Sequence, residues 1–167
     1  MTPSHDGIGS LTETEAAQLT SLLNHFVAET HADCAVLCDR SGRLLTRSGD
    51  LGSMDETAFA SLVAGDFAAS DQLARLLGEE EFSSLYHAGL GRSMYLADVS
   101  GYGILAALFN GSTTLGLIRL KSRTTVPRLV EILERIASRE PSDLGMGMDQ
   151  NWMNDAENEI DRLFGEN

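Results

Sequence analysis

The sequence predicts an α/β sandwich with a five-stranded, largely antiparallel sheet. Three observations predict it. Long segments with helical apolar spacing begin at capping signals, short apolar segments are separated by turn residues, and the order is helix, two strands, helix, three strands, helix (α-β-β-α-β-β-β-α). The 167 residues suffice for one domain and a tail.

The first helix is expected from Thr12 to about Thr30. Thr12 and Glu15 form a capping box, because each side chain can bond an unpaired amide of the other residue. Apolar residues then recur at helical spacing: Leu19, Leu22, Leu23, Phe26 and Val27. Residues 33–38 are apolar on both strand faces, which predicts a central strand, and the turn DRSG leads to its hairpin partner at residues 43–48.

Residues 55–78 predict the helix around which the chain is organised. A capping box of Ser53 and Glu56 would start this helix, and Gly78 would end it. The stripe expected to cover the sheet is Phe59, Leu62, Val63, Leu73 and Leu77. The opposite side holds Thr57, Ser61, Ala64, Ala68, Asp71, Gln72 and Arg75, with Gly65 beside them. Its small residues would admit a second body, although they could simply favour the helix. Asp66 and Ser70 fall unexpectedly on the apolar side, where a polar contact beneath the helix or across a dimer axis would be needed.

The second half predicts three strands and a helix. Residues 82–90 have the mixed polarity of an edge strand. Residues 93–98 and 103–109 form a hairpin, and the second of these strands is continuously apolar and therefore central. Residues 113–136 read as a helix overall, although TLGLIRL could be strand or helix, and Pro127 is expected to kink or divide it.

The chain ends differ from the middle in composition. We expect residues 1–10 to be disordered, residues 11–137 to form the domain and residues 138–150, rich in glycine and acids, to be a flexible linker. Residues 151–167 carry a short amphipathic stripe of Ile160, Leu163 and Phe164, which is too small to stand alone and suits docking on a partner.

Composition excludes several classes of function. A net charge of −13 with a single lysine argues against nucleic-acid binding. The longest apolar run, residues 103–109, is too short to insert in a membrane, and no secretory signal begins the chain, so a cytoplasmic location is expected. Cys34 and Cys38 are too far apart on one strand to pair, and buried reduced thiols are expected rather than a zinc site.

Motifs for catalysis are missing from the sequence. There is no P-loop, no G-x-S-x-G elbow and no H-E-x-x-H, and the four histidines are dispersed. No metal or cofactor is therefore expected, and the acidic run at residues 79–81 reads as a solvated turn. Arg75 could act as an arginine finger on a partner's phosphate, although a surface ion pair is its simpler role.

Four stretches of the chain have a recognisable pattern of apolar and small residues: AVLCDRSGRLL (35–45), SLVAGDFAASDQLARLLGEEEF (61–82), YHAGLGRSMYL (86–96) and LFNGSTTLGLIRLKSR (108–123). Together they resemble the roadblock family, whose members are small dimeric modules that regulate or scaffold Ras-like GTPases. The resemblance spans residues 12–136 and favours a helix for residues 115–120. The tail segment ENEIDRLFGEN (157–167) resembles that of family members which regulate a Ras-like GTPase in bacterial cell polarity and motility.

The resemblance implies a homodimer in which residues 82–90 pair with their copy and the two 55–78 helices lie side by side. Its interface would include Gly65, Phe82, Ser84, Tyr86 and Ala88. A Ras-like small GTPase would bind at Ala64, Ala68, Asp71, Gln72 and Arg75, and again at Ile160, Leu163 and Phe164. GTP and Mg would be bound by that partner, whose own arginine and glutamine would be aligned for hydrolysis, so Arg75 is not needed as a finger. The tail would favour nucleotide exchange, and the protein would concentrate at a cell pole.

Two other functions stay open at this point. A roadblock scaffold would bind a GTPase or kinase complex without accelerating any reaction. A small-ligand sensor domain of similar shape would need a cavity, whereas the alanines and leucines of the central strands suggest a filled interior.

Overall fold

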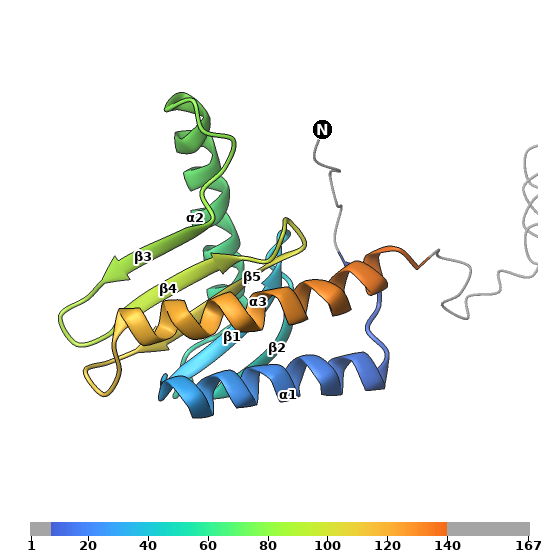
Figure 1. The fold of residues 1–167 in the computed structure, drawn as a ribbon, viewed down its shortest axis with the longest axis horizontal. Coiled ribbons are helices and arrows are strands. Elements are labelled where there is room, and N and C mark those ends of the chain that lie inside the picture. The colour runs from blue at the N-terminus through green and yellow to red at the C-terminus, as the bar shows by residue number, and fades with distance from the viewer. Residues whose placement is uncertain (1–7, 140–167) are drawn as a thin grey trace, which may run out of the picture.

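Five antiparallel strands form one sheet, and three helices cover its two faces (Figure 1). A computed structural model describes residues 8–139. The elements are α1 (Glu13–Thr30), β1 (Cys34–Asp39), β2 (Leu44–Gly49), α2 (Glu56–Leu76), β3 (Ser84–Ala88), β4 (Ser93–Asp98), β5 (Gly103–Phe109) and α3 (Leu115–Ala137). The predicted fold class and element order are confirmed.

The strand order across the sheet is β2-β1-β5-β4-β3. β1 and β5 lie inside the sheet and are buried along nearly their whole length. Their continuous apolar sequences follow from helices on both faces, which leave neither side of these strands in water. β3 is an edge strand and pairs only with β4 among the described elements, as its mixed polarity predicted.

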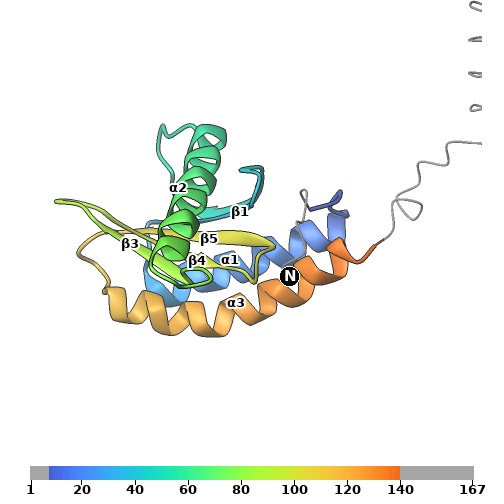
Figure 2. The same cartoon turned by 90° about the horizontal axis from the view of Figure 1, so that it is seen from above.

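Two separate cores lie on the two faces of the sheet. Side chains alternate along β1, so Ala35 and Leu37 contact the layer of α1 and α3, while Val36 and Cys38 contact α2. Figure 2 shows α1 and α3 together on one face and α2 alone on the other. The α1/α3 core is the larger, with Leu19, Phe26, Leu129 and Leu133 buried in it.

The ends and continuity of the helices differ in part from the predictions. The capping box of Thr12 and Glu15 is present. For α2, however, the cap is Asp55, whose carboxylate accepts from two backbone amides, and the predicted Ser53 box is wrong. α3 begins at Leu115 and continues through Pro127. It is not divided there, because side chains before and after the proline remain buried against the sheet.

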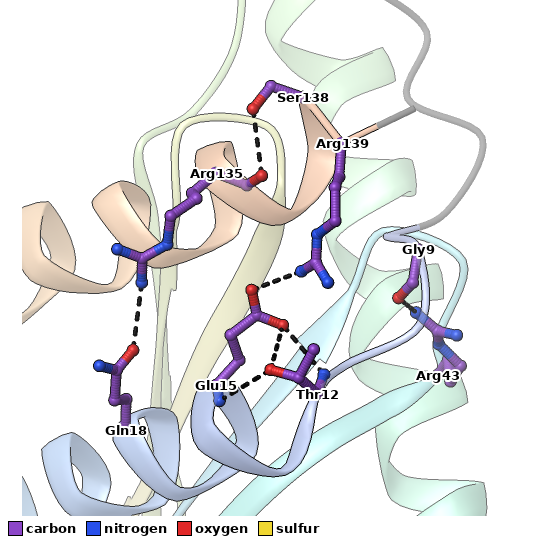
Figure 3. A network of polar contacts seen from close by, with 8 residues as sticks. All are labelled: Gly9, Thr12, Glu15, Gln18, Arg43, Arg135, Ser138 and Arg139. Carbon is purple, nitrogen blue, oxygen red and sulfur yellow. Dashed lines mark hydrogen bonds and ion pairs between the residues drawn. The ribbon is translucent and has the colours of Figure 1, made fainter. Parts of the chain in front are cut away.

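The two ends of the described chain meet beside the start of α1 (Figure 3). Ile8 is buried in the α1/α3 core, and the Arg43 guanidinium donates to the Ile8 carbonyl. The expected disorder of residues 1–10 is therefore wrong for Ile8. Arg139 forms an ion pair with Glu15, which also accepts from the Thr12 amide and hydroxyl.

The Glu15 carboxyl is held in its charged form by this network. Burial by itself would raise its pKa, but the hydrogen bonds from Arg139 and Thr12 outweigh burial and lower the pKa to about 2. Of the linker expected at residues 138–150, only Ser138, the C-cap of α3, and Arg139, paired with Glu15, are described. The rest of this linker and the docking segment expected at residues 151–167 lie outside the described residues.

Candidate functional site

The face of α2 that covers the sheet is lined by small residues and one phenylalanine. The buried residues of α2 are Ala60, Val63, Ala64, Phe67, Ser70 and Ala74. The predicted leucine stripe is correct for Val63 but wrong for its three leucines: Leu62, Leu73 and Leu77 are 73%, 56% and 74% exposed. The buried face is rotated by about 80° from the predicted one.

The small residues of α2 accommodate a turn of the same chain. Gly42, in the β1–β2 turn with φ of +88°, lies so close that a Cβ placed on it would be 2.8 Å from Ser61 Cα and 3.5 Å from Ala64 Cβ. A larger residue at Gly42 or Ala64 would separate this turn from the helix. Ala64 is 7% exposed, so its assignment to a partner-binding surface is corrected.

Asp71 is the second predicted binding residue that serves the fold. Its Oδ2 accepts from Arg40 at 3.2 Å, and Arg40 also bonds Asp98 at 2.5 Å and lies 4.8 Å from the centre of the Phe67 ring. Arg40 therefore ties α2 to the β1–β2 and β4–β5 turns. Burial raises the pKa of the Asp98 carboxyl, although Arg40 and the Gly101 amide act against this.

Three of the predicted partner-binding residues, Ala68, Gln72 and Arg75, are exposed on α2. Gly65 lies beside them, and a Cβ placed on it would meet no atom within 4 Å. These four residues span about 80° of the helix circumference, and we call them the outer face of α2. The two small residues make the first half of this face smooth, while Gln72 and Arg75 make the second half polar.

An apolar strip missed by the sequence reasoning adjoins the outer face. It consists of the exposed leucines 62, 73, 76 and 77 of α2 and its C-cap, and we call it the leucine flank. Asp66 lies within the same arc of the helix. Its Oδ2 is 2.7 Å from Nε2 of His87 in β3, which fixes the leucine flank on the β3 side of α2. This polar contact also accounts for Asp66, while Ser70 is buried against the sheet.

The β3 strand lies next to the leucine flank. Its outer edge has no partner strand among the described elements. Tyr86 stacks on Phe109 with ring centroids 6.4 Å apart and is 42% exposed. Ser84 and Ala88 point to the same face as Tyr86 because side chains alternate along a strand. Phe82, the remaining predicted interface residue, precedes the strand and is half-buried.

The two cysteines of the chain lie inside the sheet as buried thiols. Cys34 and Cys38 are free and buried, and burial is the main cause that raises their thiol pKa values to about 11 and 12. Residues 8–139 contain no cluster of three or more His, Cys, Asp or Glu residues that could hold a metal ion. No helix in this part of the chain is long and apolar enough to cross a membrane.

Comparisons with known proteins agree with this geometry. MglB of Myxococcus xanthus is 30% identical over 80% of this chain and 99% of its own, with a TM-score of 0.73. The gliding protein MglB of Thermus thermophilus is 29% identical over 75% of this chain and 95% of its own, with a TM-score of 0.69. A Roadblock/LC7 domain from Streptomyces avermitilis, at 15% identity and a TM-score of 0.64 over 69% of this chain and 97% of its own, shares the fold.

The comparison with curated proteins found no match. Residues 19–109 match the Roadblock/LC7 domain, and this range covers more than half of the chain and extends from α1 to the end of β5. The protein therefore belongs to the Roadblock/LC7 domain family.

Proposed function

We propose that the protein is a homodimeric regulator that binds a bacterial Ras-like small GTPase of the MglA type and stimulates its GTP hydrolysis. The observation that carries this proposal is the leucine flank beside the open edge of β3 in a Roadblock/LC7 chain with MglB as a structural neighbour. An exposed apolar strip of this kind marks a protein interface more often than a free surface.

The dimer would form through β3 and the leucine flank together. Pairing of β3 with its copy would satisfy the amides and carbonyls of its outer edge and produce one continuous sheet. On the α2 face, the leucine flanks of the two chains would then meet. Complete burial of a leucine side chain contributes about 1.5–3 kcal/mol, so four leucines from each chain supply a strong driving force.

The outer faces of the two α2 helices would then lie side by side and form the GTPase-binding platform. Ala68, Gln72 and Arg75 remain candidates for this contact, whereas Ala64 and Asp71 are engaged within the fold. A smooth surface near Gly65 and Ala68 permits close backbone approach. We place the tail residues Ile160, Leu163 and Phe164 at a second contact with the GTPase, where they would favour nucleotide exchange.

Stimulation would not require a catalytic group from this protein. A dimer that binds the GTPase most tightly when the arginine and glutamine of the GTPase are aligned raises the population of that conformation and therefore the hydrolysis rate. We place this activity in the cytoplasm, with concentration at a cell pole during the control of polarity and motility.

Single-turnover GTP hydrolysis by a cognate GTPase, with and without saturating dimer, tests the proposal. The rate should rise with the dimer, and Ala68→Arg should abolish this rise because the arginine adds bulk and charge to the outer face. Thr124→Arg, exposed on α3, is the matched control and should behave like the unmodified chain. Melting temperature should change little for either variant, because both positions are exposed.

The same assay separates the alternatives. A GTP-dependent complex without a change in hydrolysis would favour a scaffold for a GTPase or kinase complex over a regulator. A small-ligand sensor is less favoured, because the two hollows described, one beside the β3–β4 hairpin and one between α1 and α3, are grooves between surface elements.

A further inference from the structure

A groove of about 390 Å³ lies between α3 and the β3–β4 hairpin. Tyr95 and Ala97 of β4 contribute to it from the sheet, and Val126 and Pro127 contribute from α3. These residues belong to the α1/α3 side of the sheet, which is opposite to α2 (Figure 2). The groove is therefore separate from the outer face of α2. We call it the α3 groove.

The α3 groove is basic in a chain whose net charge is −13. Arg119 and Arg123 line it and are exposed, and within residues 8–139 neither has a carboxylate at ion-pair distance. The Arg119 guanidinium lies 6.0 Å from the centre of the Tyr95 ring. Asp98 also lines the groove, but its carboxylate is bonded to Arg40. Two cations are thus available to an acidic ligand.

We propose that the α3 groove binds the acidic C-terminal segment of the same chain, residues 155–164. Four carboxylates and one arginine surround the apolar residues of this segment. In a bound helix, Ile160, Leu163 and Phe164 would share one face and contact the apolar wall of the groove.

The spacing of charges matches between the two helices. Arg119 and Arg123 are four positions apart on α3, which places them about 6 Å apart along the helix axis. Glu157 and Asp161 have the same spacing and would lie together beside the apolar stripe of a bound helix. Two parallel ion pairs can therefore form in one register.

The connecting chain has a suitable length. Arg123 precedes Arg139 by sixteen positions, nearly all of them within α3, which corresponds to a distance of about 24 Å. The fifteen residues 140–154 span about 20 Å as a flexible coil and at most about 50 Å when extended. A linker whose mean length is close to the span gives an effective concentration on the order of millimolar, so weak contacts suffice for docking.

A second hollow, of about 340 Å³ between α1 and α3, fits this segment less well. Glu131 lines it and would repel the acidic segment. Arg135, also in its lining, is only four positions before Arg139, so the linker would have to fold back on itself. The charge of the lining residues and the distance that the linker must span both favour the α3 groove.

Docking of the segment goes beyond the proposed function and does not depend on it. If the GTPase also binds residues 155–164, the α3 groove competes with the GTPase for the tail. The tail would then be held against α3 until the GTPase displaces it, while the outer face of α2 stays free.

The full chain contains a built-in reporter, because its only tryptophan is Trp152, three residues before the segment. Trp152 fluorescence should be shifted to shorter wavelength and protected from acrylamide in the unmodified chain. Arg119→Glu with Arg123→Glu should move the emission to that of the urea-unfolded chain and raise the quenching constant at least twofold. Adding Glu157→Arg and Asp161→Arg to this variant should restore the original signal.

Arg128→Glu, on the flank of α3 that faces α1, is the matched control and should leave the emission unchanged. Circular dichroism should show that all variants are folded. Equal quenching in the unmodified chain and the double glutamate variant would overturn the proposal. A change in emission and quenching on Arg128→Glu as large as that of the double glutamate variant would also overturn it. A signal that increases with protein concentration would assign the groove to the tail of a second copy and overturn docking within one chain. None of these fluorescence measurements involves the GTPase. A failure of tail docking can therefore be told apart from a failure of the proposed GTPase regulation.

Discussion

The helices on the two faces of the sheet place their leucines differently. On the α1/α3 face, leucines such as Leu19 and Leu133 are buried against the strands. On the other face, α2 contacts the strands with alanines and Phe67, while the leucines of α2 itself point to solvent. A helix with alanine inside and leucine outside is apolar on more than one side. The difference indicates that α1 and α3 complete the fold of one chain, whereas α2 also has a surface suited to another molecule.

The two layers also differ in how the helices are held. α1 and α3 lie side by side in both views, and the Glu15–Arg139 pair links their ends (Figures 1, 2 and 3). α2 has no helical neighbour among the described elements and is held by the sheet, by the β1–β2 turn and by Arg40. We therefore expect α2 to depend strongly on a few large contacts.

Phe67→Ala should have the largest effect on stability. Phe67 is fully buried and is the largest side chain between α2 and the sheet, so its truncation should cost about 3–5 kcal/mol in the free energy of unfolding. Urea unfolding at one fixed protein concentration measures this cost. Leu62→Ala is the control and should cost far less per chain. The reverse order would show that the leucines, and not Phe67, cover the sheet.

Leu73→Glu should act on assembly rather than on the fold. A charge at this half-exposed position of the leucine flank should weaken dimerisation about 100-fold, as expected for the loss of about 2.7 kcal/mol at an interface. Sedimentation equilibrium measures the dissociation constant. Leu120→Glu, at an exposed leucine of α3, should leave it unchanged. If both variants dimerise normally, the leucine flank is not the dimer interface.

Glu15→Gln should weaken the α1/α3 layer in a pH-dependent way. The pKa of Glu15 is lowered from 4.5 to about 2 in the folded chain, so the stabilisation by its carboxylate is present above pH 4.5 and is lost as the pH falls to 2. We expect a cost of about 1–2 kcal/mol at pH 7, measured by urea unfolding. The cost should approach zero near pH 2. A cost that is the same at both pH values would rule out the charge as its origin.

Gly65→Ala should have the smallest effect. It should raise the stability of the single chain and lower the stability of the dimer. The added methyl group meets no described atom, so the helix should gain about 0.5–1 kcal/mol from alanine's higher propensity. If α2 helices cross at Gly65, the same methyl group should weaken the dimer. Unfolding and sedimentation of the same samples report the two effects. An unchanged dimer would remove Gly65 from the interface.

The sequence was sufficient for the fold because the strand and helix signals agree with each other. The continuously apolar β5 could only be central, and the capping box at Thr12 marked the start of α1 correctly. Short-range signals of this kind depend on the chain alone. The cap of α2 was missed because Ser53 and Asp55 are both good capping residues and only the local backbone chooses between them.

The candidate site was harder to predict because α2 is apolar on two sides. Hydrophobic spacing selects the larger side chains as the buried stripe, and here the larger ones are outside. Arg40 forms ion pairs with Asp71 and Asp98, which follow it by 31 and 58 residues in the sequence. No local sequence pattern therefore predicts these pairs. One usable signal was present: α2 has more leucine than a single buried stripe needs.

The meeting of the two ends of the described chain beside α1 has a practical consequence for cell biology. Gly9 and Arg139 both lie near the start of α1 (Figure 3), at the corner of the molecule remote from β3 (Figure 1). A fluorescent protein joined before residue 8, or after residue 139 in place of residues 140–167, would therefore lie at this corner and leave the β3 edge and the leucine flank unobstructed. The two fusions should give the same distribution in a cell if the tail has no part in it, and a difference between them would point to a role of the tail itself.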